Sequence, residues 1–410
     1  MIGYLYFFLG NKRIVSFGFL MTFFSSFGQT FLLSLYVPSI INNFNLTNSS
    51  FGFLYGAATI CSSLALSYTG KFIDSKSLRK YTLSAVGLLI ISCIVLAFSI
   101  NIVFVFFGVL GLRLGGQGLL SHISKTSISK KFNKSRGKAL SLSVLGYSFG
   151  EGLFPVAVGF LIAALGWRYS LISSAALIAI FLVPFVYFAL DKKEFKMTPK
   201  KVKDNKESPN FNRKELLKDS YFYVLALNVI LLPALITGLF FYQMMLAGEK
   251  GWIEGWIPAC FFAYAAGRTV FSLLSGKLID KFTAVKLMPF YLLPFFLALL
   301  SLSFFSHPFV APFYLALTGI SMGMSSTIKS AMVAEAYGTK NLGNINSLLA
   351  MLMVFGTALC PPVFGLLLDN GIDFSFIAAA AAFLVLMTSF ISYQVYGNFS
   401  VNRNIQREAA

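Results

Sequence analysis

The chain has 410 residues, of which 57% are hydrophobic and 12% are charged, and its mean hydropathy is +0.76. Because soluble domains carry about 25% charged residues, this composition excludes an ordinary water-soluble fold. The net charge of +18 is of the kind found in nucleic-acid-binding proteins, but the positions of the basic residues, described below, do not fit a nucleic-acid partner.

Twelve apolar segments recur along the chain, and each is long enough to cross a hydrocarbon core of about 30 Å as a helix. We therefore predict an all-α membrane protein with twelve transmembrane helices. The predicted spans are residues 14–40, 51–73, 81–99, 102–124, 138–164, 168–190, 220–247, 256–279, 286–306, 309–333, 342–368 and 373–396.

The sequence also repeats itself at an offset of 206 positions, so that Gly70–Asp74 corresponds to Gly276–Asp280. Each repeat contains six of the predicted spans, and both halves therefore enter the membrane in the same sense. We predict two six-helix halves related by pseudo-two-fold symmetry, residues 1–190 and 220–410. A polar cytoplasmic linker, residues 191–219, is expected to join them.

The basic residues are distributed asymmetrically along the chain. Of the 33 Lys and Arg residues, Arg113 and Arg268 lie inside spans, and Arg168 and Lys250 lie in odd-numbered connections between spans. The other 29 lie near the ends of spans, at the ends of the chain or in the even-numbered connections. The positive-inside rule then predicts a multi-pass protein of the inner or plasma membrane with both termini in the cytoplasm. Basic loops at a membrane surface contact anionic lipid, so we expect membrane lipid as their partner and no nucleic acid.

The four cysteines and two histidines show no metal-ligand spacing. An enzyme would also need a cluster of nucleophile, acid or metal ligands at one membrane face, and the sequence has no such cluster. We therefore expect no metal site, no cofactor and no enzymatic activity.

The second predicted span ends in Gly70-Lys71-Phe72-Ile73-Asp74, and a basic cluster that contains Arg79 follows it. This pattern resembles the Gly-x-x-x-Asp motif of the major facilitator superfamily, of which Asp280 ends a shorter copy after the eighth span. Glycine allows helices to approach closely, and the aspartate can face basic side chains and the N-terminal end of a neighbouring helix. The resemblance implies that Gly70, Asp74, Arg79 and Asp280 lock one conformation of a transport cycle.

Two opposite charges lie near the centres of predicted spans. Arg113 and Glu151 both reach a depth of about 17 to 20 Å from the outer ends of their helices, which makes a pair feasible. The Gly-rich segment that begins at Arg113 resembles the fourth-helix arginine motif of the same superfamily. Two interpretations stay open: the pair only permits burial of both charges, or it couples transport to protons through Glu151.

A third central charge, Arg268, lies in the eighth span at about 18 Å depth, one turn after Tyr264. The three charges sum to +1, and a bound anion would cancel this excess. A guanidinium binds a carboxylate through two parallel hydrogen bonds. We predict that Arg268 and Tyr264 bind the substrate.

Further polar residues interrupt the apolar spans. In the tenth span we expect Lys329 to extend toward the cytoplasmic surface, and pairing with Glu335 at a gate is the second interpretation. In the first and seventh spans, polar side chains are predicted to line the substrate cavity, with ordinary packing as the alternative. These residues are Gln29, Tyr36, Tyr242 and Gln243.

The approach to the fifth span, Lys131 to Leu140, is followed by the small residues Gly146 and Gly150. This stretch is similar to the fifth-helix signature of the monocarboxylate and oxalate transporter branch of the superfamily. That branch uses an eighth-helix arginine for the substrate carboxylate, and the resemblance implies this role for Arg268.

We predict a monomeric secondary active transporter that moves a small organic anion, a carboxylate, by alternating access. Transport is expected to be coupled to protons or to exchange for a counter-substrate. Export of a drug-like or siderophore-like compound is the alternative, suggested by the 16% content of aromatic residues. A transport-inactive membrane sensor is the alternative from another functional class.

Overall fold

The computed structural model describes residues 2–132, 135–190, 216, 218–337 and 342–408. All elements in these ranges are helices, and the prediction of an all-α protein is confirmed. Most of the predicted linker, residues 191–215 and 217, lies outside the described residues.

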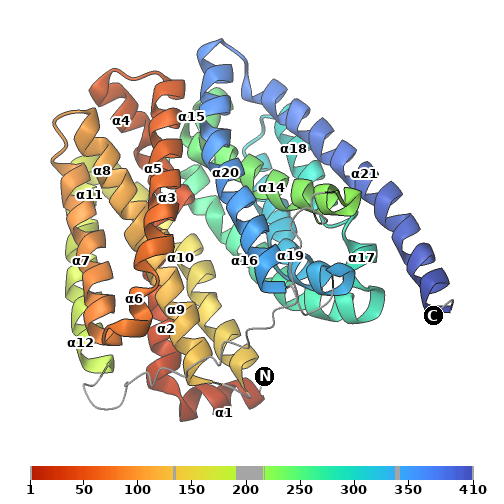
Figure 1. Cartoon of the computed structure of the whole chain (residues 1–410). Helices are drawn as coiled ribbons and strands as arrows, with labels where there is room; N and C mark the ends of the chain where they lie inside the picture. The colour runs from red at the N-terminus through yellow and green to blue at the C-terminus, as the bar shows by residue number, and fades with distance from the viewer. Residues whose placement is uncertain (1, 133–134, 191–215, 217, 338–341, 409–410) are drawn as a thin grey trace. The chain divides into compact units, whose positions relative to one another are not determined.

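Within residues 2–189, the described part of the chain forms sixteen helical elements in chain order (Figure 1). They are α1 (Ile2–Gly10), α2 (Lys12–Phe24), η1 (Ser25–Gly28), α3 (Thr30–Leu33), η2 (Ser34–Tyr36), α4 (Val37–Phe44), α5 (Asn48–Thr69), α6 (Phe72–Ser75), α7 (Leu78–Ala97), α8 (Ile102–Leu112), η3 (Arg113–Leu120), α9 (Ser121–Lys131), α10 (Arg136–Leu165), α11 (Trp167–Leu177), η4 (Ile178–Leu182) and α12 (Val183–Ala189).

The remaining helices follow the predicted linker (Figure 1). They are α14 (Ser220–Phe241), α15 (Gln243–Glu249), α16 (Trp256–Phe282), α17 (Ala284–Leu287), α18 (Leu293–Phe304), α19 (Val310–Tyr337), α20 (Leu342–Asp369) and α21 (Phe374–Glu408).

Most of these helices satisfy the length and composition of a membrane span. Within the described residues, nine continuous helical segments are long and apolar enough to cross a membrane, and some of them combine consecutive elements, such as α8, η3 and α9. The number is ten if the bent pair Lys12–Gly28 and Thr30–Phe44 is one span. Of the other two predicted spans, one contains the shorter apolar helix Leu293–Phe304, and all but the first residue of the other belong to the 28-residue helix α19. Helices therefore occupy all twelve predicted ranges, and the prediction of a membrane protein is confirmed.

The chain forms two compact units, which are described separately. The first contains Met1–Lys200 and the short segment Phe240–Met244, and the second contains Lys201–Leu239 and Met245–Ala410. In the first unit, α2 packs against both α9 and α10. In the second, α16 packs along α19, and α18 packs against α19 and α21.

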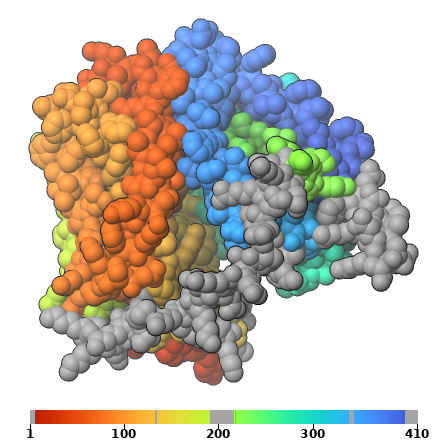
Figure 2. All heavy atoms as spheres, viewed as in Figure 1, coloured from red at the N-terminus to blue at the C-terminus, as the bar shows by residue number. Residues whose placement is uncertain are grey.

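Apolar side chains reach the surface of both units, as expected where lipid replaces water. Figure 2 shows α5 at the surface of the first unit and α20 and α21 at the surface of the second. On α5, the side chains of Leu64 and Tyr68 are 66% and 69% exposed, and on α21 that of Phe383 is 60% exposed.

Glycines bring the helices of the first unit into backbone contact. A Cβ atom built on Gly146 of α10 would lie 2.2 Å from the Phe19 carbonyl oxygen, and one on Gly150 would lie 2.1 Å from the Ser26 hydroxyl. No larger residue fits at these distances, so the small residues of the fifth predicted span determine how closely α10 approaches the first span.

Candidate functional site

The first membrane span is broken in its interior. After α2 the backbone tightens into the 3-10 turn η1, and Gln29 then adopts an extended conformation with φ −86° and ψ 150° before α3 begins. At this break the axis of the span bends by 45°. Gln29 and Thr30 are partly exposed at this bend, whereas all four residues of η1 are buried.

The fourth span is irregular at the point where it meets this break. Its backbone changes from α-helix to the wider π-helix η3, which begins at Arg113. A Cβ atom on Gly28 would lie 2.2 Å from the Leu112 carbonyl oxygen, and one on Gly116 would lie 2.6 Å from the Gly28 nitrogen. The break and the wide turn are therefore packed directly against each other, and π-helical turns are frequent at functional sites.

Arg113 binds to the break itself and is only 4% exposed. Its Nη1 atom donates to the Gly28 carbonyl at 3.2 Å and to the Thr30 hydroxyl at 3.4 Å. The guanidinium also lies 5.0 Å from the centre of the Tyr55 ring, and the Tyr55 hydroxyl is 2.6 Å from that of Thr30. A carbonyl, a hydroxyl and an aromatic face thus stabilise this buried cation.

Glu151 is buried as well, with 5% exposure, and it follows Gly150, the residue that packs against Ser26 of the break. The two central charges of the first unit therefore lie on helices that both contact the same irregular segment. The ion pair between Arg113 and Glu151 stays a prediction.

Tyr36, predicted to line a cavity, is 3% exposed, and its hydroxyl lies 3.2 Å from that of Ser170 on α11. Its environment fits the alternative of ordinary packing. Gln29 is the only partly exposed member of the four predicted lining residues.

The other two lining residues belong to the segment Phe240–Met244, which is grouped with the first unit. Both are 0% exposed. The Tyr242 hydroxyl donates to the Asn48 carbonyl at 2.7 Å, and the Gln243 amide donates to the Phe31 carbonyl at 3.0 Å and to the Ser34 hydroxyl at 2.6 Å. Their polar atoms thus hold short helices together, and their role in substrate binding stays a prediction.

Sequence reasoning missed Tyr55, which is 0% exposed and contacts both the guanidinium of Arg113 and the hydroxyl of Thr30. The available signal was a tyrosine among small and apolar residues, four residues into the second predicted span. A buried tyrosine hydroxyl usually has a hydrogen-bond partner, so it pointed to a polar neighbour.

In the second unit, Arg268 lies on α16 where the backbones of α16 and α19 are in close contact. A Cβ atom on Gly323 would lie 2.4 Å from the Arg268 carbonyl oxygen, and one on Gly319 would lie 2.3 Å from that of Tyr264. The Arg268 side chain is partly exposed, and Tyr264 is buried with its ring 5.9 Å from that of Phe261. The packing of two helix backbones therefore fixes the position of Arg268.

Lys329 of α19 has an unexpected partner. Its Nζ atom donates to the Val229 carbonyl at 3.2 Å, and Val229 lies nine residues inside α14. The expectation that this side chain extends toward the cytoplasmic surface is therefore wrong. The Cβ atoms of a helix tilt toward its N-terminus, which directs Lys329 back into the unit.

Glu335, the second interpretation for a partner of Lys329, binds the N-terminal end of α17. Its carboxylate accepts hydrogen bonds from the backbone N–H of Ala284 at 3.0 Å and of Val285 at 3.1 Å. In the described part of the chain, Lys329 makes no other hydrogen bond than the one to Val229.

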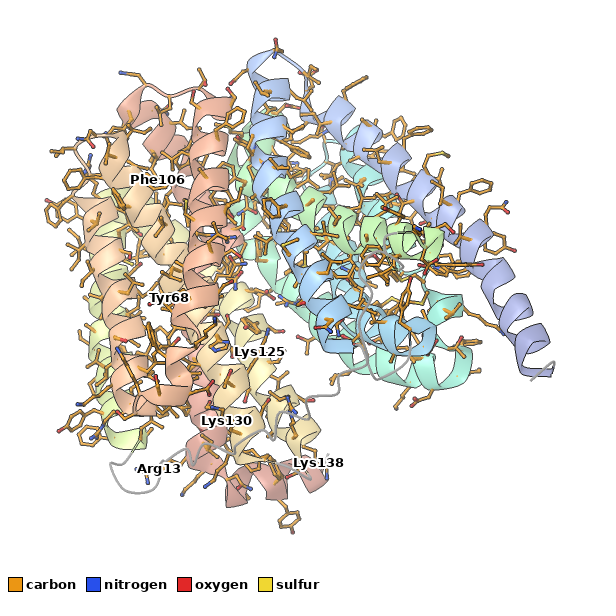
Figure 3. The ribbon with its side chains drawn as sticks, viewed as in Figure 1. Arg13, Tyr68, Phe106, Lys125, Lys130 and Lys138 are labelled. Carbon is orange, nitrogen blue, oxygen red and sulfur yellow. The ribbon has the colours of Figure 1, made fainter. Side chains whose placement is uncertain are left out.

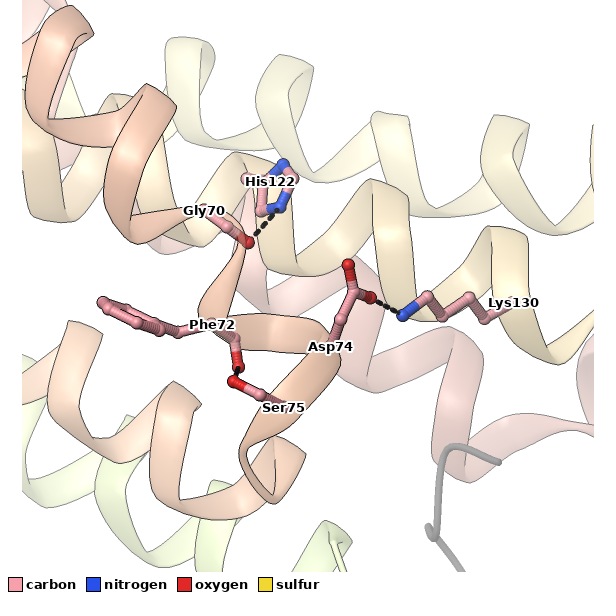
Figure 4. A network of polar contacts seen from close by, with 6 residues as sticks. All are labelled: Gly70, Phe72, Asp74, Ser75, His122 and Lys130. Atoms are coloured by element: carbon pink, nitrogen blue, oxygen red, sulfur yellow. Dashed lines mark hydrogen bonds and ion pairs between the residues drawn. The ribbon is translucent and has the colours of Figure 1, made fainter. Parts of the chain in front are cut away.

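Figure 4 shows two residues of the predicted conformational lock, Gly70 and Asp74, in close-up. Asp74 forms an ion pair with Lys130 at the end of α9, and its side chain is 65% exposed. The Nε2 atom of His122 lies 3.2 Å from the carbonyl oxygen of Gly70, the other motif residue. Both contacts join the end of the second span to the fourth, and basic residues also gather at this end of the first unit (Figure 3).

The other two predicted lock residues have different surroundings. Arg79 donates to the carbonyl of Tyr187 near the end of α12, and its guanidinium lies 4.0 Å from the centre of that ring. Asp280 is exposed, and a Cβ atom on Gly276 would meet no other atom within 4 Å. The contact between the second and fourth spans is thus made by the first copy of the motif.

The described residues contain no group of three or more His, Cys, Asp or Glu side chains that could hold a metal ion. Among curated proteins, no sequence matches this chain. The family model for the Major Facilitator Superfamily matches residues 18–262 and 247–398.

Solved structures provide further matches. A bacterial homologue of the human lysosomal transporter Spinster, inward-facing and unoccupied, has a TM-score of 0.69 at 14% identity, covering 95% of this chain and 94% of that one. A point variant of the nucleoside transporter NupG has a TM-score of 0.76 at 14% identity, covering 93% of this chain and 98% of that one. At this identity the likeness shows the fold alone.

Proposed function

Because this chain belongs to the major facilitator superfamily, as its sequence predicted, we propose that it is a secondary transporter that carries a small organic carboxylate across the membrane by alternating access. The similar solved structures include a nucleoside transporter and a Spinster homologue, so their fold does not select a substrate class. The proposal for the substrate therefore depends on the charged residues of this chain. Assignment to the monocarboxylate and oxalate branch stays a prediction.

The observation that supports a carboxylate most strongly is the position of Arg268. Backbone packing against Gly319 and Gly323 fixes this arginine within its span, and its side chain remains partly exposed. A cation kept within a membrane span at an energetic cost of about 2.5 to 3.5 kcal/mol marks a functional site by default. Its planar guanidinium matches the geometry of a carboxylate.

We propose that Glu151 carries the proton if transport is proton-coupled. The residue before it packs against the break in the first span, and Arg113 binds the Gly28 carbonyl at the same break. Loss of the negative charge of Glu151 on protonation would change the electrostatic energy of the buried Arg113 and so the stability of the bend. Exchange for a counter-substrate is the alternative that needs no titration of Glu151.

We also propose that the ion pair of Asp74 with Lys130 and the contact of His122 with Gly70 favour one state of the transport cycle. The ion pair is largely exposed, so its strength is modest, about 1 kcal/mol or less. Such an energy is enough to change the population ratio of two states about fivefold without preventing their exchange.

Counterflow in proteoliposomes tests the proposal. The purified protein is assayed with monocarboxylates, dicarboxylates, a nucleoside and a cationic dye at two pH values. We expect exchange of carboxylates only, and exchange of the nucleoside or the dye alone would refute the substrate class. Binding of a carboxylate without any counterflow would indicate a sensor in place of a transporter.

Two variants extend this assay to the proposed roles. Arg268→Gln should abolish carboxylate exchange, whereas Lys277→Gln, which removes an exposed charge from the same helix, should leave exchange unchanged. Glu151→Gln should retain exchange but lose accumulation driven by a pH gradient. Retained accumulation in Glu151→Gln would exclude proton coupling through this residue.

A further inference from the structure

The hydrogen bond between Lys329 and α14 has a cause in the covalent structure of the chain. In a helix the carbonyl of Val229 would accept from the N–H of the residue four positions later, which is Pro233. Proline has no N–H, so the Val229 carbonyl lacks its helical partner. The Lys329 ammonium donates to this carbonyl at 3.2 Å.

The neighbouring carbonyl of α14 is also bound from outside the helix. The Tyr291 hydroxyl donates to the Asn228 carbonyl at 2.9 Å. Side chains from two other segments thus hold α14 at Asn228 and Val229, and the ammonium of Lys329 is fixed in place near the proline.

One neutral carbonyl does not satisfy this cation. An ammonium has three N–H donors, and Lys329 uses one of them within the described residues. No carboxylate of those residues forms an ion pair with it, and the side chain remains partly exposed. Two of its N–H donors are therefore available to a ligand.

The charge balance of the spans changes accordingly. With Lys329 directed into the second unit, this unit places two cations, Arg268 and Lys329, within its spans. Their formal charges give an excess of +2. A ligand with two negative charges balances this excess, whereas a monocarboxylate leaves half of it uncompensated.

The spacing of the two cations of the second unit favours two separate anionic groups. The glycine contacts show that α16 and α19 run parallel, with Gly323 level with Arg268. Lys329 lies six residues further along, which corresponds to roughly 9 Å along the helix axis. Both side chains lean toward the N-terminal ends of their helices, so this separation is preserved.

We propose that Lys329 is a second substrate-binding residue and that the transported anion is a small dicarboxylate. One carboxylate binds Arg268 and the other binds the free N–H donors of Lys329. An extended four-carbon dicarboxylate together with two charge-assisted hydrogen bonds spans roughly the axial separation of the two cations. This inference rests on the proposed function, from which it takes the carboxylate substrate and the role of Arg268.

Matched pairs of ligands test the proposal. Malonate, succinate and glutarate are compared with their monomethyl esters, which keep the carbon skeleton and lose one charge. In counterflow with the wild-type protein, we expect the concentration that gives half-maximal exchange to be about tenfold or more lower for at least one diacid than for its monoester.

Substitutions then assign this preference to Lys329. Lys329→Gln retains an N–H donor for the Val229 carbonyl but loses the charge, so the protein should fold and the diacid preference should disappear. Lys329→Arg should retain the preference, and the matched control Lys277→Gln should behave as wild type. Thermal unfolding in detergent checks that each variant is folded.

The outcomes separate this inference from the proposed function. Exchange of monoesters as efficiently as diacids by the wild-type protein would overturn the dicarboxylate proposal and leave the carboxylate transporter in place. Equal weakening of diacid and monoester by Lys329→Gln would overturn the role of Lys329. If the protein exchanges no carboxylate of either kind, the proposed function itself is wrong.

Discussion

The close approach of Gly28 and Gly116 predicts a large effect from the smallest possible substitution. In Gly116→Ala the new Cβ atom would lie 2.6 Å from the nitrogen and 2.8 Å from the Cα atom of Gly28, and 3.1 Å from the Ser25 carbonyl oxygen. All three neighbours are backbone atoms, which cannot rotate away as the end of a side chain can. Overpacking of this kind costs about 1 to 3 kcal/mol.

Thermal unfolding provides the assay for this substitution. The side chains of Cys93 and Cys260 are 1% and 6% exposed, so a thiol-reactive dye detects unfolding when heating makes these thiols accessible. We expect the midpoint of Gly116→Ala to fall by several degrees. Gly87→Ala is the matched control, because a Cβ atom at that helical position meets nothing within 4 Å, and alanine should stabilise it slightly. An unchanged midpoint for Gly116→Ala would refute the packing of the fourth span against the break.

Three further predictions concern charged groups. Asp74→Lys should change the exchange rate in counterflow with little loss of stability. The double variant Asp74→Lys with Lys130→Asp, which exchanges the two charges, should restore the rate. Failure of this rescue would show that the ion pair does not act in the transport cycle. Arg113→Gln should lower the unfolding midpoint more than Tyr55→Phe does. The reason is that a hydrogen bond from a charged group contributes about 1.5 to 3 kcal/mol, whereas a neutral one contributes about 0.5 to 1.5 kcal/mol. Equal midpoints or the reverse order would contradict the contacts at the break. Lys250 lies outside the membrane spans and donates to Ser375, and burial lowers its pKa. The folded state therefore binds fewer protons than the unfolded state, so stability should rise as the pH approaches the ordinary lysine value of 10.5. Lys250→Met should remove this rise in thermal unfolding curves, and a persisting rise would assign it to other groups.

The fold and the spacing of the membrane spans could be predicted because hydrophobic length is sufficient to specify them. Each predicted span contains helix in the structure, and small residues such as Gly146 and Gly150 mark points of backbone contact, as expected for helices that pack in lipid. The motif that contains Asp74 was recognisable because glycine, aspartate and basic residues recur at fixed spacing. Its contact with Lys130 confirms the expectation that Asp74 faces a basic side chain.

The break in the first span could not be located from its own residues. Ser25 to Gly28 contain no proline, and an apolar run with one glycine is compatible with a continuous helix. The break is stabilised by residues about 85 positions away, where Arg113 binds the Gly28 carbonyl and Gly116 leaves space for the turn. Periodicity along one segment carries no information about such a partner.

The environment of Lys329 was predicted wrongly for a related reason. Its distance along its own helix placed it near the cytoplasmic mouth, where lysines usually reach water. The deciding residue is Pro233 on another helix, which exposes a carbonyl that attracts the ammonium. Arg79 contacts Tyr187, 108 positions further along the chain, a contact that local spacing could not locate; its role in the lock stays a prediction.

The affinity of the purified protein for its best carboxylate, measured by calorimetry for the wild type and for Arg268→Gln, tests the central claim most directly. Loss of a bidentate charged contact should weaken binding about tenfold or more, while Lys277→Gln should bind as the wild type does. Binding by Arg268→Gln that matches the wild type would contradict the account, because the proposed carboxylate site would then not contain Arg268.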